Sequence, residues 1–250
     1  MIKIAVANQK GGVGKTTISF NLASILADQK GSRVLAVDND PQGNLTSSFL
    51  EDTSKLKGHV LSIYDDSPVI PESITKNLSF LGASITLSPV AERDFHVIFK
   101  LKEALDAFDH QFDYCIIDSL PSFGHLHLAA LNAADYILIP ITPSPYPLDG
   151  MSELISTIDR TRKYFNPSLE ILGIIINQLD GRKLVLQREM EESLRDMYGD
   201  LVFKTRINKR IKIEESPTFQ TPITLYDPDG PSVREFNSMA TEILRRLKNE

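Results

Sequence analysis

The chain has 250 residues, of which 42% are hydrophobic and 24% are charged, and its formal net charge is −6 at pH 7. This length and composition predict one globular domain over residues 1–250 with a sizeable core, and they make a second domain unnecessary. The negative charge excludes a surface that is basic all over, so any nucleic-acid site has to be a local patch.

The chain carries no sign of secretion or of a membrane span. No basic and apolar leader opens it, and no apolar stretch approaches the roughly 18 to 20 residues that a membrane helix requires. The single cysteine, Cys115, lies in an apolar run, so no internal disulfide can form and the thiol is expected to be a small buried hydrophobe. We therefore expect a cytoplasmic protein without membrane contact.

Short apolar runs rich in β-branched residues alternate with longer helix-like segments along the chain. The runs cover residues 2–7, 33–38, 78–83, 114–118, 136–141 and 170–177. Continuous apolar runs of this kind suit parallel strands with helices on both faces. The predicted fold class is therefore α/β, a doubly wound and mostly parallel sheet whose ligands gather at the carboxyl ends of the strands.

Three further segments complete the predicted organisation. Residues 51–76 and 215–232 are richer in polar residues, proline and glycine, and we interpret both as loop-rich excursions rather than linkers. The last helix is predicted over residues 233–248. Its apolar residues form one stripe, which is more typical of a core-facing helix than of a membrane-seeking one: Phe236, Met239, Ala240, Ile243, Leu244 and Leu247.

The first apolar run leads into the stretch NQKGGVGKTT, residues 8–17. It departs from the usual phosphate-binding loop, G-x-x-x-x-G-K-[ST], because Gln9 replaces the first glycine and Lys10 adds a second lysine to Lys15. A chance glycine-rich loop with two solvated lysines is the alternative. The strand before the stretch and the amphipathic helix after it favour a P-loop.

Each residue type of the loop suits phosphate chemistry. The glycines let successive backbone N–H groups turn inward around phosphate oxygens, and the start of the helix adds its positive dipole end. Lys15 is expected to reach the β- and γ-phosphates, and Thr16 to supply a hydroxyl ligand to Mg²⁺. The predicted nucleotide-binding residues of the loop are Gly11, Gly12, Val13, Gly14, Lys15, Thr16 and Thr17.

Two acidic motifs end other apolar runs. Asp118 closes YCIID, where a buried carboxylate is costly unless it serves a cation or a hydrogen-bond network, so we interpret it as a Walker B aspartate. Asp38 and Asp40 end the run that leads into VDNDPQGN, and they share one side if the strand continues to Asp40. One of the pair can orient the attacking water. The alternative is turn chemistry, since Asp before Pro commonly begins a turn.

These motifs resemble those of the ParA/Soj/MinD group of deviant Walker A ATPases and, within it, of the ParA/Soj partition ATPases. The resemblance runs over nearly the whole chain, through NQKGGVGKTT, VDNDPQGN, IIDSLPSFG, LNAAD, PLDG and EESPTFQTPITLYDP. It implies an ATPase that uses ATP and Mg²⁺ and forms a homodimer when ATP-bound. Lys10 resembles the lysine with which the family crosses the dimer interface to contact the phosphates of the other subunit's ATP.

The resemblance also implies roles for residues outside the loop. Asp40 matches the family's water-positioning carboxylate, which makes it a catalytic candidate together with Lys10 and Lys15. Asp38 is implied near the magnesium shell, which Thr16 and Asp118 would form.

Two positions resemble the adenine contacts of the family, and one departs from its pattern. Asn177 and Pro217 fall where the family contacts adenine, but Asn177 could instead cap a strand end and Pro217 could be an ordinary loop proline. Leu120 stands where a second proline usually follows the Walker B aspartate. This departure falls in the local switch loop and leaves the metal site intact.

A basic stretch over residues 203–213 resembles the family segment that contacts DNA without sequence preference. Its cations are Lys204, Arg206, Lys209, Arg210 and Lys212. The alternative is a solvated basic face. Because Asp229 and Pro231 stand where relatives often carry further arginines, DNA affinity is expected to be modest or to rely on a C-terminal group: Arg234, Arg245, Arg246 and Lys248.

Several functions compete at this point. The favoured one is a nucleoid-associated switch for plasmid or chromosome partition, with weak ATP hydrolysis that a ParB-like partner stimulates. A ParA-like ATPase that positions chemoreceptor arrays or microcompartments is the alternative. A MinD-like membrane-associated ATPase would need a basic amphipathic tail, and a relative of nitrogenase iron protein would need two cysteines. His125 and His127 are expected to be surface residues, not metal ligands.

Overall fold

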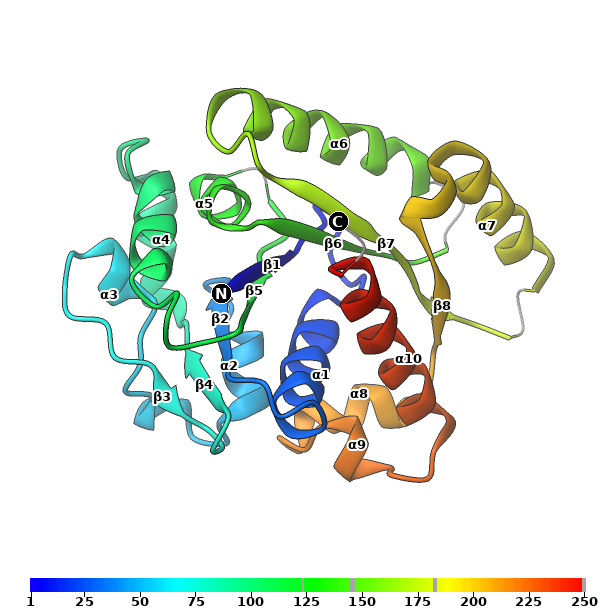
Figure 1. The fold of residues 1–250 in the computed structure, drawn as a ribbon, viewed down its shortest axis with the longest axis horizontal. Helices are drawn as coiled ribbons and strands as arrows, with labels where there is room; N and C mark the ends of the chain where they lie inside the picture. The colour runs from blue at the N-terminus through cyan, green and yellow to red at the C-terminus, as the bar shows by residue number, and fades with distance from the viewer. Residues whose placement is uncertain (123, 144–146, 182–183, 249–250) are drawn as a thin grey trace.

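One twisted sheet runs through the middle of the molecule, with helices packed on both of its faces (Figure 1). The computed structural model describes residues 1–122, 124–143, 147–181 and 184–248. Within them, eight strands form the sheet in the order β3-β4-β2-β5-β1-β6-β7-β8. The strands are β1 (Ile2–Val6), β2 (Val34–Asn39), β3 (Glu72–Ser73), β4 (Leu78–Leu81), β5 (Tyr114–Ser119), β6 (Tyr136–Ile141), β7 (Glu170–Leu179) and β8 (Val202–Asn208).

The pairing of the strands confirms the predicted fold class. Among the described strands, β3 alone pairs antiparallel, and the rest pair in parallel. All six predicted strands are present, as β1, β2, β4, β5, β6 and β7. The edge strands β3 and β8 lie outside the prediction. β8 mixes buried with exposed residues, among them Lys204 and Arg206, so its sequence lacks the apolar run of an inner strand.

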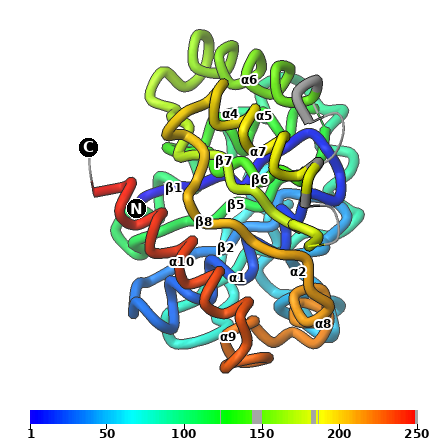
Figure 2. Tube along the Cα trace, turned by 90° about the vertical axis from the view of Figure 1, so that its right-hand side faces the viewer, coloured from blue at the N-terminus to red at the C-terminus, as the bar shows by residue number. Residues whose placement is uncertain are grey.

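The helices divide between the two faces of the sheet (Figures 1 and 2). Helices α3, α4, α5, α6 and α7 contribute to the core on one face, and α1, α2, α8, α9 and α10 to the core on the other. Their bounds are α1 (Lys15–Asp28), α2 (Asn44–Phe49), α3 (Leu61–Tyr64), α4 (Val97–Asp106), α5 (His125–Ala133), α6 (Pro147–Tyr164), α7 (Leu184–Tyr198), α8 (Ile211–Thr218), α9 (Ile223–Tyr226) and α10 (Pro231–Arg246). Three 3₁₀ helices are η1 (Thr53–Lys55), η2 (Ile85–Glu92) and η3 (Gly199–Leu201).

The two predicted excursions differ in how well they match the structure. Residues 51–76 are mostly irregular and hold only η1, α3 and β3. Residues 215–232 contain more helix than expected, since α8 includes Pro217 and α9 follows it. Tertiary contacts outweigh the local proline signal here: α8 packs against α1 and α2, and the Ile223 amide at the start of α9 donates to Asn21 Oδ1 at 2.8 Å.

Helix α10 faces the core as predicted. Phe236, Met239, Ala240 and Ile243 are fully buried, and the helix packs on β8 and α1. Cys115 is also fully buried, as expected of a small hydrophobe. Among the described residues, no helix is long and apolar enough to span a membrane.

Candidate nucleotide-binding site

The loop of residues 8–17 lies between β1 and α1, at the carboxyl ends of the central strands (Figure 1). Strand β5 pairs with β1 on one side and β2 on the other, so Asp118 lies beside both Val6 and Asp38 in the register of the sheet. Residues 112 and 80 positions from Asp118 in the sequence therefore meet it at the carboxyl ends of the strands. This is the place where ligands gather in a parallel sheet.

Glycine conformations shape the loop. Gly12 and Gly14 adopt positive φ angles of 72° and 87°, in the left-handed region that side chains with a Cβ atom rarely enter. A Cβ atom added at Gly11 or Gly12 would meet nothing within 4 Å, so the loop is open on that side. Gly14 is the N-cap of α1, which directs the helix N-terminus toward the loop. The loop thus provides the open cradle and backbone donors that a nucleotide phosphate requires.

The two lysines of the loop have different surroundings. Lys15 is 7% exposed, and its Nζ donates to the backbone oxygen of Lys10 at 3.2 Å. Burial lowers the pKa of Lys15, while the negative charges of Asp118 and Asp40 oppose that shift. Lys10 is exposed, and its backbone N–H donates to Asn8 Oδ1 at 2.9 Å. The structure therefore places one lysine inside the loop and the other on its outer side.

Asp118 is buried and bonded to the first turns of α1. Thr16 Oγ1 donates to Asp118 Oδ2 at 2.7 Å, and Ser19 Oγ donates to Asp118 Oδ1 at 2.9 Å. Burial raises the pKa of Asp118 to about 7, and the nearby carboxyl of Asp38 contributes to the rise. Because Thr16 donates its only proton to Asp118, its oxygen lone pairs remain available to a hard cation. The pair fits Mg²⁺, which takes few protein oxygens.

Asp38 is fully buried and holds the start of α2. Its Oδ2 accepts hydrogen bonds from the Thr46 amide at 2.8 Å and from Thr46 Oγ1 at 2.7 Å, and its Oδ1 accepts from the Asp40 amide at 3.1 Å. Burial raises the pKa of Asp38 to about 6. These bonds give Asp38 a structural task beside the site, which the sequence pattern does not reveal.

Asp40 lies just beyond β2, which ends at Asn39. Its Oδ1 accepts from the Gln42 amide at 2.9 Å, and its carbonyl accepts from the Gly43 amide at 2.9 Å. The turn chemistry considered as an alternative is therefore present. It does not exclude a role in the site, because the Asp40 carboxylate is 7% exposed and near enough to influence the pKa of Lys15.

Two side chains at the end of β7 donate hydrogen bonds to carbonyls of the phosphate-binding loop. Asn177 Nδ2 donates to the Val13 carbonyl at 2.8 Å, and a Cβ atom on Gly14 would lie 2.2 Å from this nitrogen. Gln178, in the left-handed region with φ 58°, donates from Nε2 to the Gly12 carbonyl at 2.9 Å. A non-glycine residue with positive φ is a strained position of the kind that clusters at functional sites. Asn177 therefore braces the loop, while Pro217 lies on α8.

The predicted basic stretch is largely paired with acids. Arg206 pairs with Glu191 at 3.1 Å, Lys209 with Glu214 at 3.6 Å, Arg210 with Glu235 at 2.6 Å, and Lys212 with Asp227 at 2.7 Å. No carboxylate of the described residues pairs with the Lys204 ammonium. The stretch is thus less positive in the fold than in the sequence.

The expectation that both histidines lie on the surface is wrong for His127. This residue is fully buried in α5, and neither ring nitrogen has a well-formed hydrogen bond within the described residues. Burial lowers the pKa of His127 to about 4, although the Leu120 backbone favours the protonated ring. His125 is half-buried and its ring meets Phe95 edge-on. Within the described residues, no group of three or more His, Cys, Asp or Glu could hold a metal ion.

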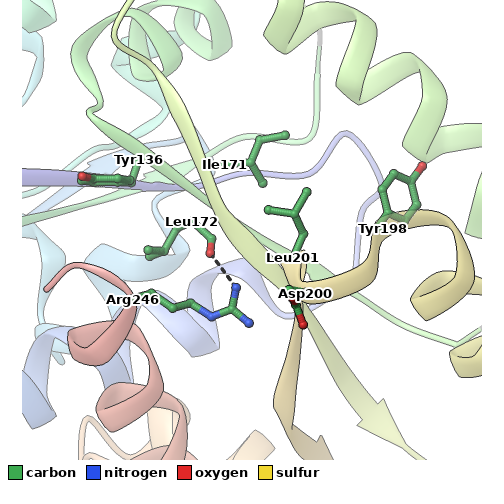
Figure 3. Close-up of a pocket in the computed structure, with 7 residues that line it drawn as sticks. All are labelled: Tyr136, Ile171, Leu172, Tyr198, Asp200, Leu201 and Arg246. Atoms are coloured by element: carbon green, nitrogen blue, oxygen red, sulfur yellow. Dashed lines mark hydrogen bonds between the residues drawn. The ribbon is translucent and has the colours of Figure 1, made fainter. Parts of the chain in front are cut away.

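A hollow lies at the opposite, amino ends of β6 and β7 (Figure 3). Tyr136 and Leu172 line it near the starts of β6 and β7, together with Arg246 of α10. The Arg246 guanidinium is committed to the protein, since it donates to the Leu172 carbonyl at 3.2 Å and to Glu242 at 3.0 Å. This hollow does not share residues with the phosphate-binding loop.

The loop, its buried lysine and the threonine–aspartate pair together define a P-loop ATPase of the deviant Walker A type. Residues 1–171 match a family described as an AAA domain. Sporulation initiation inhibitor protein Soj of Bacillus subtilis is 38% identical over 251 residues, which cover 96% of this chain and 97% of that protein. The chromosome-partitioning ATPase Soj of Thermus thermophilus is 35% identical, over 98% of this chain and 96% of that protein.

A solved structure extends the comparison to bound ligands. Cobyrinic acid a,c-diamide synthase from Mycobacterium smegmatis, with bound ATP analog and magnesium, matches with a TM-score of 0.80 and 29% identity, over 99% of this chain and 96% of that one. The chain belongs to the Soj/ParA family of ATPases. It is an ATPase, and its cofactors are ATP and Mg²⁺.

Proposed function

We propose that this chain is an ATP-dependent switch for plasmid or chromosome partition. It dimerises when ATP is bound, the dimer binds DNA without sequence preference, and slow hydrolysis ends the DNA-bound state. A ParB-like partner stimulates that hydrolysis. The names of its Soj and ParA relatives support the assignment to partition.

The observation that carries this proposal is the contrast between Lys10 and Lys15. Lys15 is buried within its own loop, whereas Lys10 is exposed on the outer side. An exposed cation at this position can serve the nucleotide of a second subunit. Dimerisation then depends on the charge of the bound nucleotide, as in switches that respond to a γ-phosphate.

In this proposal, some of the remaining site residues bind the nucleotide and its metal ion, and another acts in hydrolysis. Lys15 and the loop amides bind phosphate, and Thr16 with Asp118 would hold Mg²⁺. When bound, Mg²⁺ neutralises charge that develops on the phosphate oxygens. Asp40 orients the attacking water. Asn177 holds the loop in place and lies beside the adenine in this proposal.

The DNA surface in this proposal is the exposed part of the 203–213 stretch. Lys204 is exposed, and the side chains of Arg206, Lys209 and Lys212 are each more than half exposed despite their ion pairs. An ion pair with an exposed cation stabilises the fold little, so DNA phosphates can draw these cations away from the carboxylates. Binding of this kind is sensitive to salt, with a Kd on the order of 10⁻⁴ to 10⁻⁶ M.

The experiment that tests the switch compares the wild type with Asp40→Ala on DNA. Protein is loaded on a long duplex with ATP, free ATP is removed, and protein release is followed together with phosphate production. The variant should keep binding ATP and DNA but lose on the order of 10²- to 10⁴-fold in hydrolysis rate, so that it stays on the DNA. The exposed Asp94, changed to alanine, is the matched control. Release and hydrolysis of Asp40→Ala at the wild-type rate would reduce Asp40 to a turn residue.

A further inference from the structure

We propose that Tyr64 and Asn39 form a positioning pair that holds the Asp40 turn against helix α5 and thereby sets the rate of ATP hydrolysis. The inference rests on the proposed role of Asp40 in orienting water. It concerns two residues whose side chains make no hydrogen bond to the phosphate-binding loop or to the Thr16–Asp118 pair in the described part of the chain.

Asn39 lies between Asp38 and Asp40 as the last residue of β2. Successive side chains of a strand point to opposite faces of the sheet. Asp38 bonds to Thr46 of α2 on one face, whereas Asn39 reaches α5 on the other, where its Nδ2 donates to the Leu126 carbonyl at 2.7 Å. The strand end that carries Asp40 is therefore fixed from both faces.

Tyr64 completes the second of these attachments. Its hydroxyl donates to Asn39 Oδ1 at 2.8 Å, and its side chain is almost fully buried in the same core cluster as Leu126. Burial raises the pKa of Tyr64 above its ordinary value, so the phenol keeps its proton and remains a donor. Both polar groups of the Asn39 amide are thus satisfied by named partners.

The backbone of Tyr64 is held in turn by neighbouring elements. Arg93 Nη1 donates to the Tyr64 carbonyl at 2.9 Å, and Lys100 Nζ of α4 donates to it at 3.4 Å. Asn39 bonds to the first turn of α5, the helix that follows Asp118 and its loop. The pair therefore connects the Asp40 turn to α5 through Asn39 and to α3 through Tyr64, both on one face of the sheet.

Stability alone does not require polar residues at these two places. An amide buried in an apolar cluster costs free energy unless each polar atom is bonded, whereas replacing both partners by apolar groups of similar shape can be nearly neutral. Tyr64 and Asn39 depend on each other in this way. What an apolar pair cannot supply is a directional bond that fixes the end of β2.

A shift of the β2 end would act on turnover rather than on nucleotide binding. The Asp40 amide and carboxylate are bonded only within the turn, to Asp38 and Gln42, as far as the described residues show. Displacement of a reacting group by about 1 Å can cost on the order of 10²-fold in rate. Lys15 and Thr16 lie on α1 and do not bond to the pair, so the KM for ATP should be preserved.

The test uses Tyr64→Phe, Asn39→Leu and the double variant. Each single variant leaves a buried polar group unpaired, so both Tm and kcat should fall, with kcat about 3- to 30-fold lower and KM for ATP within about twofold of wild type. The double variant removes the unpaired groups, so its Tm should recover while its kcat stays low. Recovery of kcat together with Tm would show a merely structural role and would overturn the proposal.

A second measurement separates this inference from the proposed function. In an Asp40→Ala background, Tyr64→Phe should cause no further loss of the single-turnover hydrolysis rate, because the pair acts through Asp40. If Asp40→Ala alone keeps the wild-type rate, the proposed role of Asp40 and the positioning pair both fail. If Asp40→Ala is slow but the three pair variants hydrolyse ATP at the wild-type rate, the positioning pair fails and the proposed function stands.

Discussion

The two lysine-containing stretches of the chain, residues 8–17 and 203–213, carry their positive charge in opposite ways. In the first, Lys15 is buried by a loop with no carboxylate bonded to its ammonium among the described residues. In the second, four of five cations already pair with carboxylates. The Lys15 ammonium is thus available to a ligand, whereas most cations of the second stretch are paired with carboxylates of the fold.

The difference shows that the charge of a segment is set by its neighbours in space. The acids that pair with the second stretch come from α7, α8 and α10 and from the turn after α9: Glu191, Glu214, Glu235 and Asp227. The cations Arg206, Lys209 and Lys212 are more than half exposed, so their pairs are weak, whereas Arg210 is 30% exposed and donates two hydrogen bonds to the Glu235 carboxylate. The cations of this stretch should therefore fall into two functional groups.

The largest expected effect concerns ATP affinity and the two lysines of the loop. Lys15→Ala should weaken binding of a non-hydrolysable ATP analogue by about 3 kcal/mol or more, roughly 100-fold, because charge-assisted bonds to phosphate are lost. Lys10→Ala should change this affinity by less than about threefold, since a rim charge contributes little to a single subunit. Isothermal titration calorimetry measures both, with the exposed Lys30→Ala as control. Similar losses of affinity in Lys15→Ala and Lys10→Ala would contradict the different roles given to the two lysines.

The next effect separates Arg210 from Lys204. Arg210→Ala should lower the free energy of unfolding by about 1 to 3 kcal/mol, because Glu235 would keep only its bonds to Asn208 in a half-buried position. Lys204→Ala should leave stability within about 0.5 kcal/mol of wild type but reduce the salt dependence of DNA binding by a slope of about one per subunit. Denaturant unfolding and salt-titrated DNA binding are the measurements. A fall in DNA affinity for Arg210→Ala without loss of stability would contradict the assignment of Arg210 to the fold rather than to DNA binding.

A smaller effect concerns pH and the buried ring of His127. Its pKa is about 4 in the fold against an ordinary value of 6.5, so the unfolded chain takes up the proton first as the pH falls. Between pH 7.5 and 5 the wild type should lose about 2 kcal/mol of unfolding free energy relative to His127→Leu. The raised pKa values of Asp38 and Asp118 act in the opposite sense, and they cancel in the comparison of the two proteins. A constant difference between wild type and variant across this range would show that the ring titrates normally.

The inner strands and the loop could be predicted because their signals are local. The run around Cys115 is continuously apolar, and the glycines of the loop stand next to Lys15 in the sequence. Strand β8 was not predicted because its sequence contains charged residues. An edge strand can carry Lys204 and Arg206 at its exposed positions. His127 looked polar, but its place on the buried side of α5 decides its environment.

The hydrogen bonds that support the site could not be predicted, because they join residues far apart in the chain. The bonds of Asn39 to Tyr64 and Leu126 span 25 and 87 positions, and Gln178 reaches the loop from 166 positions away. Short-range periodicity carries no information about such contacts. The only local signal was an asparagine within an otherwise apolar and acidic strand end, at Asn39.

The central claim is that Lys10 serves the nucleotide of a partner subunit, and the molar mass in solution tests it most directly. Light scattering after size exclusion should show a monomer without nucleotide and a dimer with a non-hydrolysable ATP analogue for the wild type. Lys10→Ala should bind the analogue yet remain a monomer, and Lys15→Ala, at an analogue concentration too low to saturate its weakened site, should neither bind the analogue nor dimerise. A nucleotide-dependent dimer of undiminished stability in Lys10→Ala would contradict the claim.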